Sequence, residues 1–584
     1  MFSLPGFSLS LFEPVPRYSN ASLTSSLSYP PAMMEHNLVD LVSSKTLIAL
    51  IALITHYAVH RSEWDNDFHI VIGIWIILFG TIASVEYTAA AGAKSASIAI
   101  QLAARTASLY FAILVVSILL HRGLYHRLQK IPGPFLARFS KLYGIFVGVL
   151  STNFQYFKWL ESIHEYYEVD VIRTGPREVT VFCADSIALV HGPTSKCNKS
   201  TIYSTTGEIA GRALHFTTNR DEHRQRRKVW DRAFNAKALR EYEPRLNRHA
   251  VALISKLKEQ TTLSSVRITN WVNFYSFDVM GDIGFNRSFG MVESGEEHNV
   301  IKLLHDSQAP LSVLVHISWA MRLIARTPIG SQPLFKHMKW SAQVLEERKK
   351  NTPKEKDVFS CLLGSNADQI TPEMNADSRL LIIAGSDTVS ATLSYLLYEL
   401  CKNLTIQAKL RSVIDTMEPE KAYLDVEDVA ECAFLDGVIN ETLRLHPATP
   451  SGPQRETPPE GLTLPDGTYI PGKVNIWIPI YSLQRDSRYW REPLSFMPER
   501  WTDERPDAII ERRAFLPFLT GSYSCIGQKL AMMELRSVTA NLVRSFELTF
   551  ADGEDGSTIE NKSRDCFTMN VGKMDVRLTP RYDN

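Results

Sequence analysis

Apolar residues are concentrated in three long stretches near the start of the chain, whereas later segments mix apolar and polar positions. The three stretches lie near Leu38–Val59, Phe68–Tyr87 and Ile98–Leu120. A helix that crosses a membrane needs about 20 predominantly apolar residues. The second and third stretches meet this requirement, whereas two charged residues and a histidine interrupt the first. The pattern therefore predicts a membrane anchor of two or three transmembrane helices in residues 38–120.

The segments on either side of this anchor differ from it in composition. Residues 1–37 contain few charges and several prolines and serines, which predicts a flexible tail; a cleaved signal peptide is not expected, because no basic leader precedes the apolar run. Basic residues that follow a span stay in the cytosol. They are clustered directly after the third stretch, at His121, Arg122, His126, Arg127 and Lys130. Three spans would place the tail in the lumen, where Asn20 could be glycosylated, and two would leave it in the cytosol.

Residues 121–140 predict a basic, proline-rich hinge, because the prolines in Lys130–Phe135 stiffen the chain and stop a helix. The remaining residues, 141–584, contain no internal repeat and favour one large domain. The formal net charge of zero gives no support for nucleic-acid binding. The cysteines are odd in number and lack metal-ligand spacing, which argues against a disulfide scaffold or a zinc site and fits a reducing compartment. These are Cys183, Cys197, Cys361, Cys401, Cys432, Cys525 and Cys566.

Short alternating segments in the large domain predict strands. Two strands around a turn are expected at Val171–Pro176 and Val179–Phe182. A second pair of this kind is expected at Ile470–Gly472 and Val474–Ile478. The charged run Glu346–Lys356 is expected to be a solvated loop.

A cysteine lies in a glycine-containing loop near the C-terminus, Phe518–Gly527, directly before a run of helix formers. Gly521 and Gly527 allow the backbone to fold tightly around a flat cofactor. Free N–H groups at the start of the following helix stabilise a thiolate at Cys525. A thiolate bound to haem iron favours cleavage of the O–O bond. The alternative is a buried free cysteine without chemistry.

A second segment, Leu380–Val389, has an apolar helical pattern interrupted by small and polar residues. A glycine inside a helix costs about 1 kcal/mol relative to alanine, so Gly385 needs a reason. We expect a local gap in which dioxygen is held, with the Thr388 hydroxyl and the Asp387 carboxylate relaying protons. The alternative is an ordinary core helix.

Two further segments predict a charged network. Glu441 and Arg444 are three residues apart on one face of a helix that ends before Pro447. Arg500 follows in the segment Phe496–Trp501 and could complete a buried network, which fixes a geometry even where it adds little stability. Taken alone, the first pair is more typical of a surface ion bridge.

In this order the four segments resemble the signatures of the cytochrome P450 superfamily, from about Lys130 to the C-terminus. The resemblance implies a mainly α-helical, triangular fold with small β-sheets, preceded by the transmembrane helices. It also implies haem b between the Thr388 helix and the Cys525 loop, with Cys525 as the iron ligand and residues 141–584 as a haem-thiolate monooxygenase domain. Phe518 would pack near the sulfur and tune its electron donation. Glu441, Arg444 and Arg500 would hold the scaffold beneath the haem.

The resemblance further implies which residues bind the haem propionates. His223 and Arg227 occupy the family's propionate-binding helix, with His223 where many members have Trp. Arg455 corresponds to a second propionate-binding arginine. The sequence departs from the family at Tyr523, two residues before the cysteine, where most members carry Arg. A phenol can donate one hydrogen bond to a propionate but cannot neutralise its charge.

The activity implied is that of a membrane-anchored monooxygenase that inserts one oxygen atom of O2 into a lipophilic metabolite. NADPH would supply electrons through NADPH–cytochrome P450 reductase, with cytochrome b5 as an optional donor, because the chain contains no glycine-rich nucleotide loop. In this family the location is the endoplasmic reticulum membrane, with the domain facing the cytosol. The segments Ser195–Lys199, Asp278–Asp282 and Gly521–Cys525 resemble fungal secondary-metabolism members, including tryprostatin-hydroxylase-like enzymes, without choosing among alkaloids, terpenoids and polyketides.

Two other classes of function are alternatives to a monooxygenase. A haem-thiolate isomerase or dehydratase needs no reductase and no proton relay, and Thr388 favours a monooxygenase over it. A non-enzymatic membrane receptor or transporter would explain the apolar N-terminal stretches. It would leave the ordered haem signatures unexplained.

Overall fold

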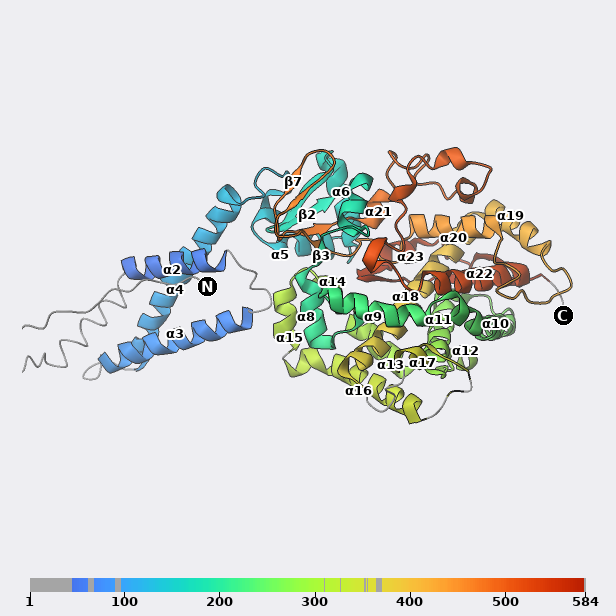
Figure 1. Cartoon of the computed structure of the whole chain (residues 1–584), viewed down its shortest axis with the longest axis horizontal. Helices are drawn as coiled ribbons and strands as arrows, with labels where there is room; N and C mark the ends of the chain where they lie inside the picture. Colours follow the sequence, from blue (N-terminus) through green and yellow to red (C-terminus); the bar gives the residue numbers. More distant parts are fainter. Residues whose placement is uncertain are drawn as a thin grey trace, which may run out of the picture. The chain divides into compact units, whose positions relative to one another are not determined.

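The structure is a computed structural model that describes residues 45–60, 68–89, 96–308, 310–325, 327–350, 353, 355–363 and 370–581 (Figure 1). The chain divides into two compact units. The first contains residues 1–57 and 74–115, and the second contains residues 58–73 and 116–584. The predicted tail, residues 1–37, and the candidate glycosylation site Asn20 lie outside the described residues.

Helices cover the three apolar N-terminal stretches as far as these are described: α2 (Lys45–Val59), α3 (Phe68–Ala89) and α4 (Ala96–Leu120). A π-helical turn extends α4 to Tyr125, and this 30-residue helix is long and apolar enough to cross a membrane. Within the first unit, Tyr110 donates a hydrogen bond of 3.0 Å to Thr55. The apolar segments of α2 and α3 are shorter, so the number of spans stays a prediction.

The second unit is mainly helical, as the sequence predicts. Its central element is α18 (Pro372–Lys402), which packs most extensively against α11 (Ile268–Phe285). α18 is also apolar enough to span a membrane, but most of it is buried, which identifies it as a core helix. The other helices are α5 (Lys141–Tyr143), α6 (Tyr156–Tyr167), α7 (Ile187–His191), α8 (Thr201–Ala210), α9 (Arg220–Ala233), α10 (Ala236–Glu259), α12 (Met291–Ser294), α13 (Asn299–Gln308), α14 (Leu311–Leu314), α15 (Ser318–Ala325), α16 (Pro328–Lys350), α17 (Val358–Leu363), α19 (Leu404–Asp415), α20 (Ala433–Leu445), α21 (Ile480–Leu483), α22 (Gln528–Ser545) and α23 (Ser557–Lys562).

The strands form small sheets. A five-stranded sheet has the order β1-β2-β8-β5-β3 and is antiparallel except between β2 and β8. A three-stranded sheet has the order β4-β12-β9, and two hairpins pair β10 with β11 and β6 with β7. The strands are β1 (Val171–Gly175), β2 (Glu178–Val181), β3 (Asn198–Lys199), β4 (Val266–Arg267), β5 (Arg455–Glu456), β6 (Leu462–Thr463), β7 (Tyr469–Ile470), β8 (Asn475–Trp477), β9 (Phe546–Phe550), β10 (Arg564–Cys566), β11 (Thr568–Asn570) and β12 (Asp575–Pro580).

Two segments of this unit differ from the prediction. The hairpin β1–β2 is confirmed, but Ile470 and the strand β8 belong to different sheets and do not pair with each other. The expected solvated loop at Glu346–Lys356 is wrong over its first part, because α16 continues to Lys350. Its Arg348 is buried and binds Asp357 by an Nη2–Oδ1 hydrogen bond of 2.9 Å, so one charge of the run belongs to the core.

Candidate active site

A cavity of about 290 Å³ lies in the second unit between α18 and the loop that precedes α22. Thr388 lines it from α18 and Cys525 from the loop, so the structure brings together two residues that are far apart in the sequence. The other predicted site residues that line it are Phe518, Tyr523, Gly527, His223, Arg227 and Arg455.

The cysteine loop has a fixed backbone. The Cys525 N–H donates to the carbonyl of Phe518 at 2.8 Å, and α22 begins three residues after Cys525, at Gln528. Although the thiol is accessible from the cavity, its depth in the protein raises the pKa of Cys525; the N–H groups of Gly527 and Gln528 and the charge of Arg227 lower it in part. The N–H groups at the start of α22 therefore lower the pKa of Cys525, as predicted. Burial has the larger, opposite effect on the pKa of the thiol.

Glycine is needed at the two loop positions, Gly521 and Gly527, for different physical reasons. Gly521 has a φ of +71°, and a Cβ there would lie 2.3 Å from the carbonyl oxygen of His191, at the end of α7. Gly521 thus lets the loop pack on neighbouring backbone. A Cβ on Gly527 would meet only the Cys525 sulfur, at 4.0 Å. Gly527 therefore leaves space beside the sulfur on the cavity wall, which is the room a flat cofactor needs.

The helix α18 presents Thr388 to the cavity. The Thr388 hydroxyl donates to the carbonyl of Ala384 at 2.8 Å. Gly385 also lines the cavity, but a Cβ there would lie 2.5 Å from the side chain of Met280 on α11. Met280 packs against this glycine, so close helix packing is one physical reason for it, and the gap for dioxygen stays a prediction.

Among the described residues, Thr388 lines the cavity of Cys525, whereas Asp387 lines a second cavity instead. Its carboxylate accepts a hydrogen bond from Gln308 Nε2 at 2.9 Å and lies 3.5 Å from His305 Nε2. Both partners are on α13. The structure therefore separates the two residues that the sequence analysis expected to act side by side.

Two arginines, Arg455 and Arg227, make one part of the cavity lining basic. Arg455 is buried, its Nε has no hydrogen-bond partner among the described residues, and its guanidinium lies 5.0 Å from the ring of Tyr523. Arg227 donates to the carbonyl of Ser524 at 2.8 Å and to Asp231 at 2.9 Å. Arg455 therefore lines the cavity and has a donor that no described residue uses, whereas Arg227 also braces the cysteine loop.

The two aromatic residues in this part of the lining supply no charge. The Tyr523 hydroxyl donates to Asn198 Oδ1 at 3.1 Å, and the ring of His223 lies 4.8 Å from the Tyr523 ring. Burial, and then the neighbouring cations, of which Lys199 is the strongest, lower the pKa of His223 to about 3. A neutral His223 can donate a hydrogen bond but cannot neutralise a carboxylate.

Lys199 is a cavity residue that the sequence analysis missed. It pairs with Arg455 in the register of β3 and β5, and its ammonium lies 4.8 Å from the Tyr523 ring. The Nζ donates to the carbonyls of Leu214, His215 and Thr217 at 3.1, 2.7 and 3.0 Å. Burial lowers the pKa of Lys199 well below its usual range. The one sequence signal was its place in the segment Ser195–Lys199.

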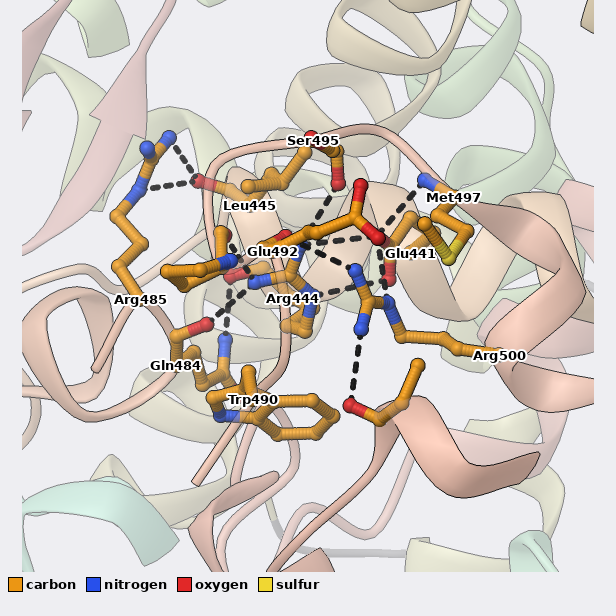
Figure 2. Close-up of polar contacts among 12 residues, drawn as sticks. Glu441, Arg444, Leu445, Gln484, Arg485, Trp490, Glu492, Ser495, Met497 and Arg500 are labelled. Carbon is orange, nitrogen blue, oxygen red and sulfur yellow. Dashed lines mark hydrogen bonds and ion pairs between the residues drawn. The ribbon is translucent and has the colours of Figure 1, made fainter. Parts of the chain in front are cut away.

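The predicted charged network is present and fully buried (Figure 2). Arg444 binds both oxygens of Glu441, at 2.8 and 2.9 Å, and Arg500 Nε binds Glu441 at 2.9 Å. The Trp501 indole N–H and the Met497 backbone N–H each donate to Glu441 at 2.9 Å. Every strong acceptor site of the carboxylate is thus used, as burial of a charge requires.

Gln484 connects this network to the segment that leads into the cysteine loop. Its side-chain amide donates to the carbonyls of Leu443 and Arg444, each at 2.9 Å. Its side-chain oxygen accepts from the Leu516 N–H at 2.8 Å. The end of α20 therefore fixes the chain two residues before Phe518. No motif in the sequence pointed to Gln484.

Comparisons with known proteins agree with this arrangement. The family model described as Cytochrome P450 matches residues 141–577. Cytochrome P450 monooxygenase FCK2 from Fusarium pseudograminearum is 33% identical, over 92% of this chain and 97% of its own. Tryprostatin B 6-hydroxylase from Aspergillus fumigatus is 35% identical, over 81% of this chain and 84% of its own.

A solved structure shows the same fold. The crystal structure of the cytochrome P450DA heme domain superposes with a TM-score of 0.65 at 16% identity, over 77% of this chain and 98% of that one. At this identity the likeness concerns the fold alone, and the sequence relatives carry the assignment of activity. The chain belongs to the cytochrome P450 family, and it is a monooxygenase enzyme related to those of fungal secondary metabolism.

Proposed function

We propose that the protein is a membrane-anchored haem-thiolate monooxygenase that hydroxylates a lipophilic secondary metabolite, with O2 and with electrons that originate from NADPH. The observation that carries this proposal is that the Cys525 thiol and the Thr388 hydroxyl line one cavity, from opposite elements. Apolar side chains of α18 and α20 complete the walls at Leu381, Val389 and Leu443. Walls of this kind favour a lipophilic substrate and exclude water.

The residues around the cavity fit haem b. A soft sulfur donor lies at one wall, Gly527 leaves open space beside it, and the basic part of the lining holds an Arg455 donor that no described residue uses and that is suited to a carboxylate. Cys525 would hold the iron and Phe518 would pack beside the sulfur. Arg455 and Arg227 would bind the propionates, with hydrogen bonds from His223 and Tyr523. When bound, haem supplies the redox-active iron at which dioxygen is reduced.

Lys199 is a candidate source of the positive charge that Tyr523 lacks. The family's usual arginine is absent at position 523, and the buried ammonium of Lys199 lies directly over the phenol ring. We propose that a bound propionate favours the ammonium form of Lys199, which burial alone disfavours, so that Lys199 then supplies part of the missing positive charge. Tyr523 holds Asn198 at the start of β3. Glu441, Arg444 and Arg500, through Gln484, keep the approach to the cysteine loop in place.

The electron donor and the membrane topology extend the proposal. The sequence contains no nucleotide-binding glycine loop, so NADPH–cytochrome P450 reductase is the expected donor, with cytochrome b5 as an optional second one. The apolar length of the helix Ala96–Tyr125 supports an anchor in residues 38–120, with residues 121–140 as the hinge. The basic residues after α4 favour the cytosolic face of the endoplasmic reticulum membrane for residues 141–584.

The reduced, CO-bound spectrum of the full-length protein in detergent tests the core of the proposal. Folded, haem-loaded protein should show the Soret band of a thiolate-ligated haem, and reductase plus NADPH should drive oxygen consumption. A band at the position of histidine ligation in folded protein would reject the proposal. Product formation without NADPH or reductase would instead identify an isomerase or dehydratase.

Replacing Thr388 with alanine should leave haem loading intact but release two- to tenfold more hydrogen peroxide per NADPH consumed, because the cavity loses its hydroxyl proton donor. The stoichiometry of peroxide to NADPH, measured without added substrate, checks this. Ser378→Ala is the matched control, since its hydroxyl also donates to a carbonyl of α18, that of Asn375 at 2.8 Å, outside the cavity. Equal peroxide yields in the two variants would remove Thr388 from the mechanism.

Replacing Arg455 with alanine should weaken haem binding by tenfold or more, because a hydrogen bond to a charged group contributes about 1.5–3 kcal/mol. Tyr523→Phe should weaken it only a few-fold, since that hydroxyl already binds Asn198. Lys199→Met should fall between the two. The rate of haem transfer to an excess of apomyoglobin measures all three. Equal loss of haem in Tyr523→Phe and Arg455→Ala would show that the phenol is a principal propionate ligand.

A further inference from the structure

A second cavity, of about 240 Å³, lies against a different face of α18 from the haem cavity. Most of its lining side chains are polar, and they include Asn273, Glu297, His305, Gln308, Asp387 and Lys573. Thr568, at the start of β11, lines both cavities. A polar space of this size holds water readily. We call it the polar chamber.

Three titratable groups cross the polar chamber from the surface to α18. Glu297 Oε1 lies 3.1 Å from His305 Nδ1, and His305 Nε2 lies 3.5 Å from Asp387 Oδ1. The exposed fraction of the side chains falls along this series, from 36% for Glu297 to 25% for His305 and 7% for Asp387. The series therefore connects solvent with the residue that directly precedes Thr388.

The charges around His305 favour its protonated form. Burial lowers the pKa of His305, but the hydrogen bonds and charges of Asp387 and Glu297 outweigh burial and raise it to about 9. Among the side chains that the structure describes, Lys573 lines the chamber and Lys302 is close to Glu297. The ring of Phe277 also lies 5.7 Å from the His305 ring, edge to face. At neutral pH the imidazolium thus carries a proton on each nitrogen, one facing each carboxylate.

We propose that Glu297, His305 and Asp387 supply protons to the Thr388 side of α18. His305 Nε2–H passes its proton to Asp387 Oδ1, which leaves a neutral ring with its remaining proton on Nδ1, facing Glu297. The ring must then turn to bring the bare Nε2 to water at the surface beside Glu297, take up a proton there and turn back. Water in the polar chamber, next to Thr568, provides the onward path. This inference rests on the proposed function.

The chemistry creates a need for such a path. Inserting one oxygen atom of O2 into a C–H bond reduces the other atom to water, with two electrons from NADPH and two protons. The walls of the haem cavity are largely apolar, and Asp387 points away from it into the polar chamber. Gln308, which donates to Asp387 Oδ2 at 2.9 Å, is a positioning residue that holds the carboxylate toward His305. The competing explanation is a purely structural clamp between α13 and α18.

Two substitutions separate the explanations, in full-length enzyme with reductase. His305→Gln keeps a hydrogen-bonding side chain but cannot pass a proton. Glu297→Gln changes an exposed side chain, so we expect little effect on folding. Both should retain haem content and the reduced-CO band, while peroxide released per NADPH rises three- to tenfold and the solvent isotope effect on NADPH oxidation increases. His298→Gln, which changes a histidine near the chamber but outside the series, should match the parent.

The pH dependence gives a readout that a structural clamp would not change. In the parent, peroxide per NADPH should rise as pH increases through about 9, where His305 loses its proton, and this rise should be absent in His305→Gln. NMR titration of selectively labelled histidines should show the raised pKa of His305, and Glu297→Gln should lower it. Parent-like peroxide yields, isotope effects and pH profiles in both variants would overturn the proposal. A parent without the thiolate band would instead reject the proposed function.

Discussion

Replacing Cys525 with serine is expected to abolish both the thiolate-type CO spectrum and NADPH-dependent oxygen chemistry. A neutral hydroxyl is a poor donor to haem iron, and Cys525 is the one cysteine among the residues that line the described cavity. Substrate-independent NADPH oxidation should fall at least 100-fold. The reduced-CO difference spectrum and the NADPH oxidation rate, measured on the same preparation, check the two parts of this expectation.

The control for this variant is Cys183→Ser, which removes a half-buried thiol outside the cavity. It should leave both the spectrum and the oxidation rate unchanged. Retention of the thiolate band in Cys525→Ser would mean that another group holds the iron. Loss of the band in Cys183→Ser would point to general unfolding rather than to ligation.

The second large effect is expected at Glu441. Glu441→Ala should lower the free energy of unfolding of the second unit by about 3–5 kcal/mol, because it leaves two buried guanidinium groups without their carboxylate. Arg444 and Arg500 are each at most 1% exposed, so water cannot replace the lost partner. Urea unfolding followed by circular dichroism, or the shift in thermal midpoint, measures this change.

The matched control is Glu504→Ala. Glu504 also pairs with a cation, with 2.8 Å between its carboxylate and Lys409 Nζ, but its side chain is 55% exposed. Solvent screening limits such a pair to about 0–1 kcal/mol. Similar destabilisation by the two substitutions would contradict a special contribution of the buried network. A small loss at Glu441 would show that the guanidinium groups find new acceptors among the surrounding carbonyls.

Local chemistry is what made the main features predictable from the sequence. The helical pattern around Thr388, the Glu441–Arg444 spacing and the glycines around Cys525 each lie within about ten residues, so backbone preferences and helix periodicity express them directly. Their order along the chain was sufficient to indicate the family and the mainly helical fold. The helix α4 likewise follows from a long, predominantly apolar run.

What the sequence could not determine depends on contacts between distant segments. Asp387 and Thr388 are neighbours in the chain, yet Gln308 and His305 of α13 contact the Asp387 carboxylate in the polar chamber, away from the cavity that Thr388 lines. Met280 gives a packing reason for Gly385 because α11 crosses α18 at that residue. Neither relation leaves a local pattern.

The basic part of the cavity lining shows the same division. Arg455 was predicted from its segment, whereas Lys199 reaches the cavity through the pairing of β3 with β5, strands more than 250 residues apart. Gln484 joins the end of α20 to the segment before the cysteine loop, across separations of 41 and 32 residues. The sequence by itself therefore determined which chemistry the protein carries. Only the tertiary structure decided which charged side chains meet at the cavity lined by Cys525 and Thr388 and which cavity Asp387 faces, because strand register and helix packing are properties of the whole chain.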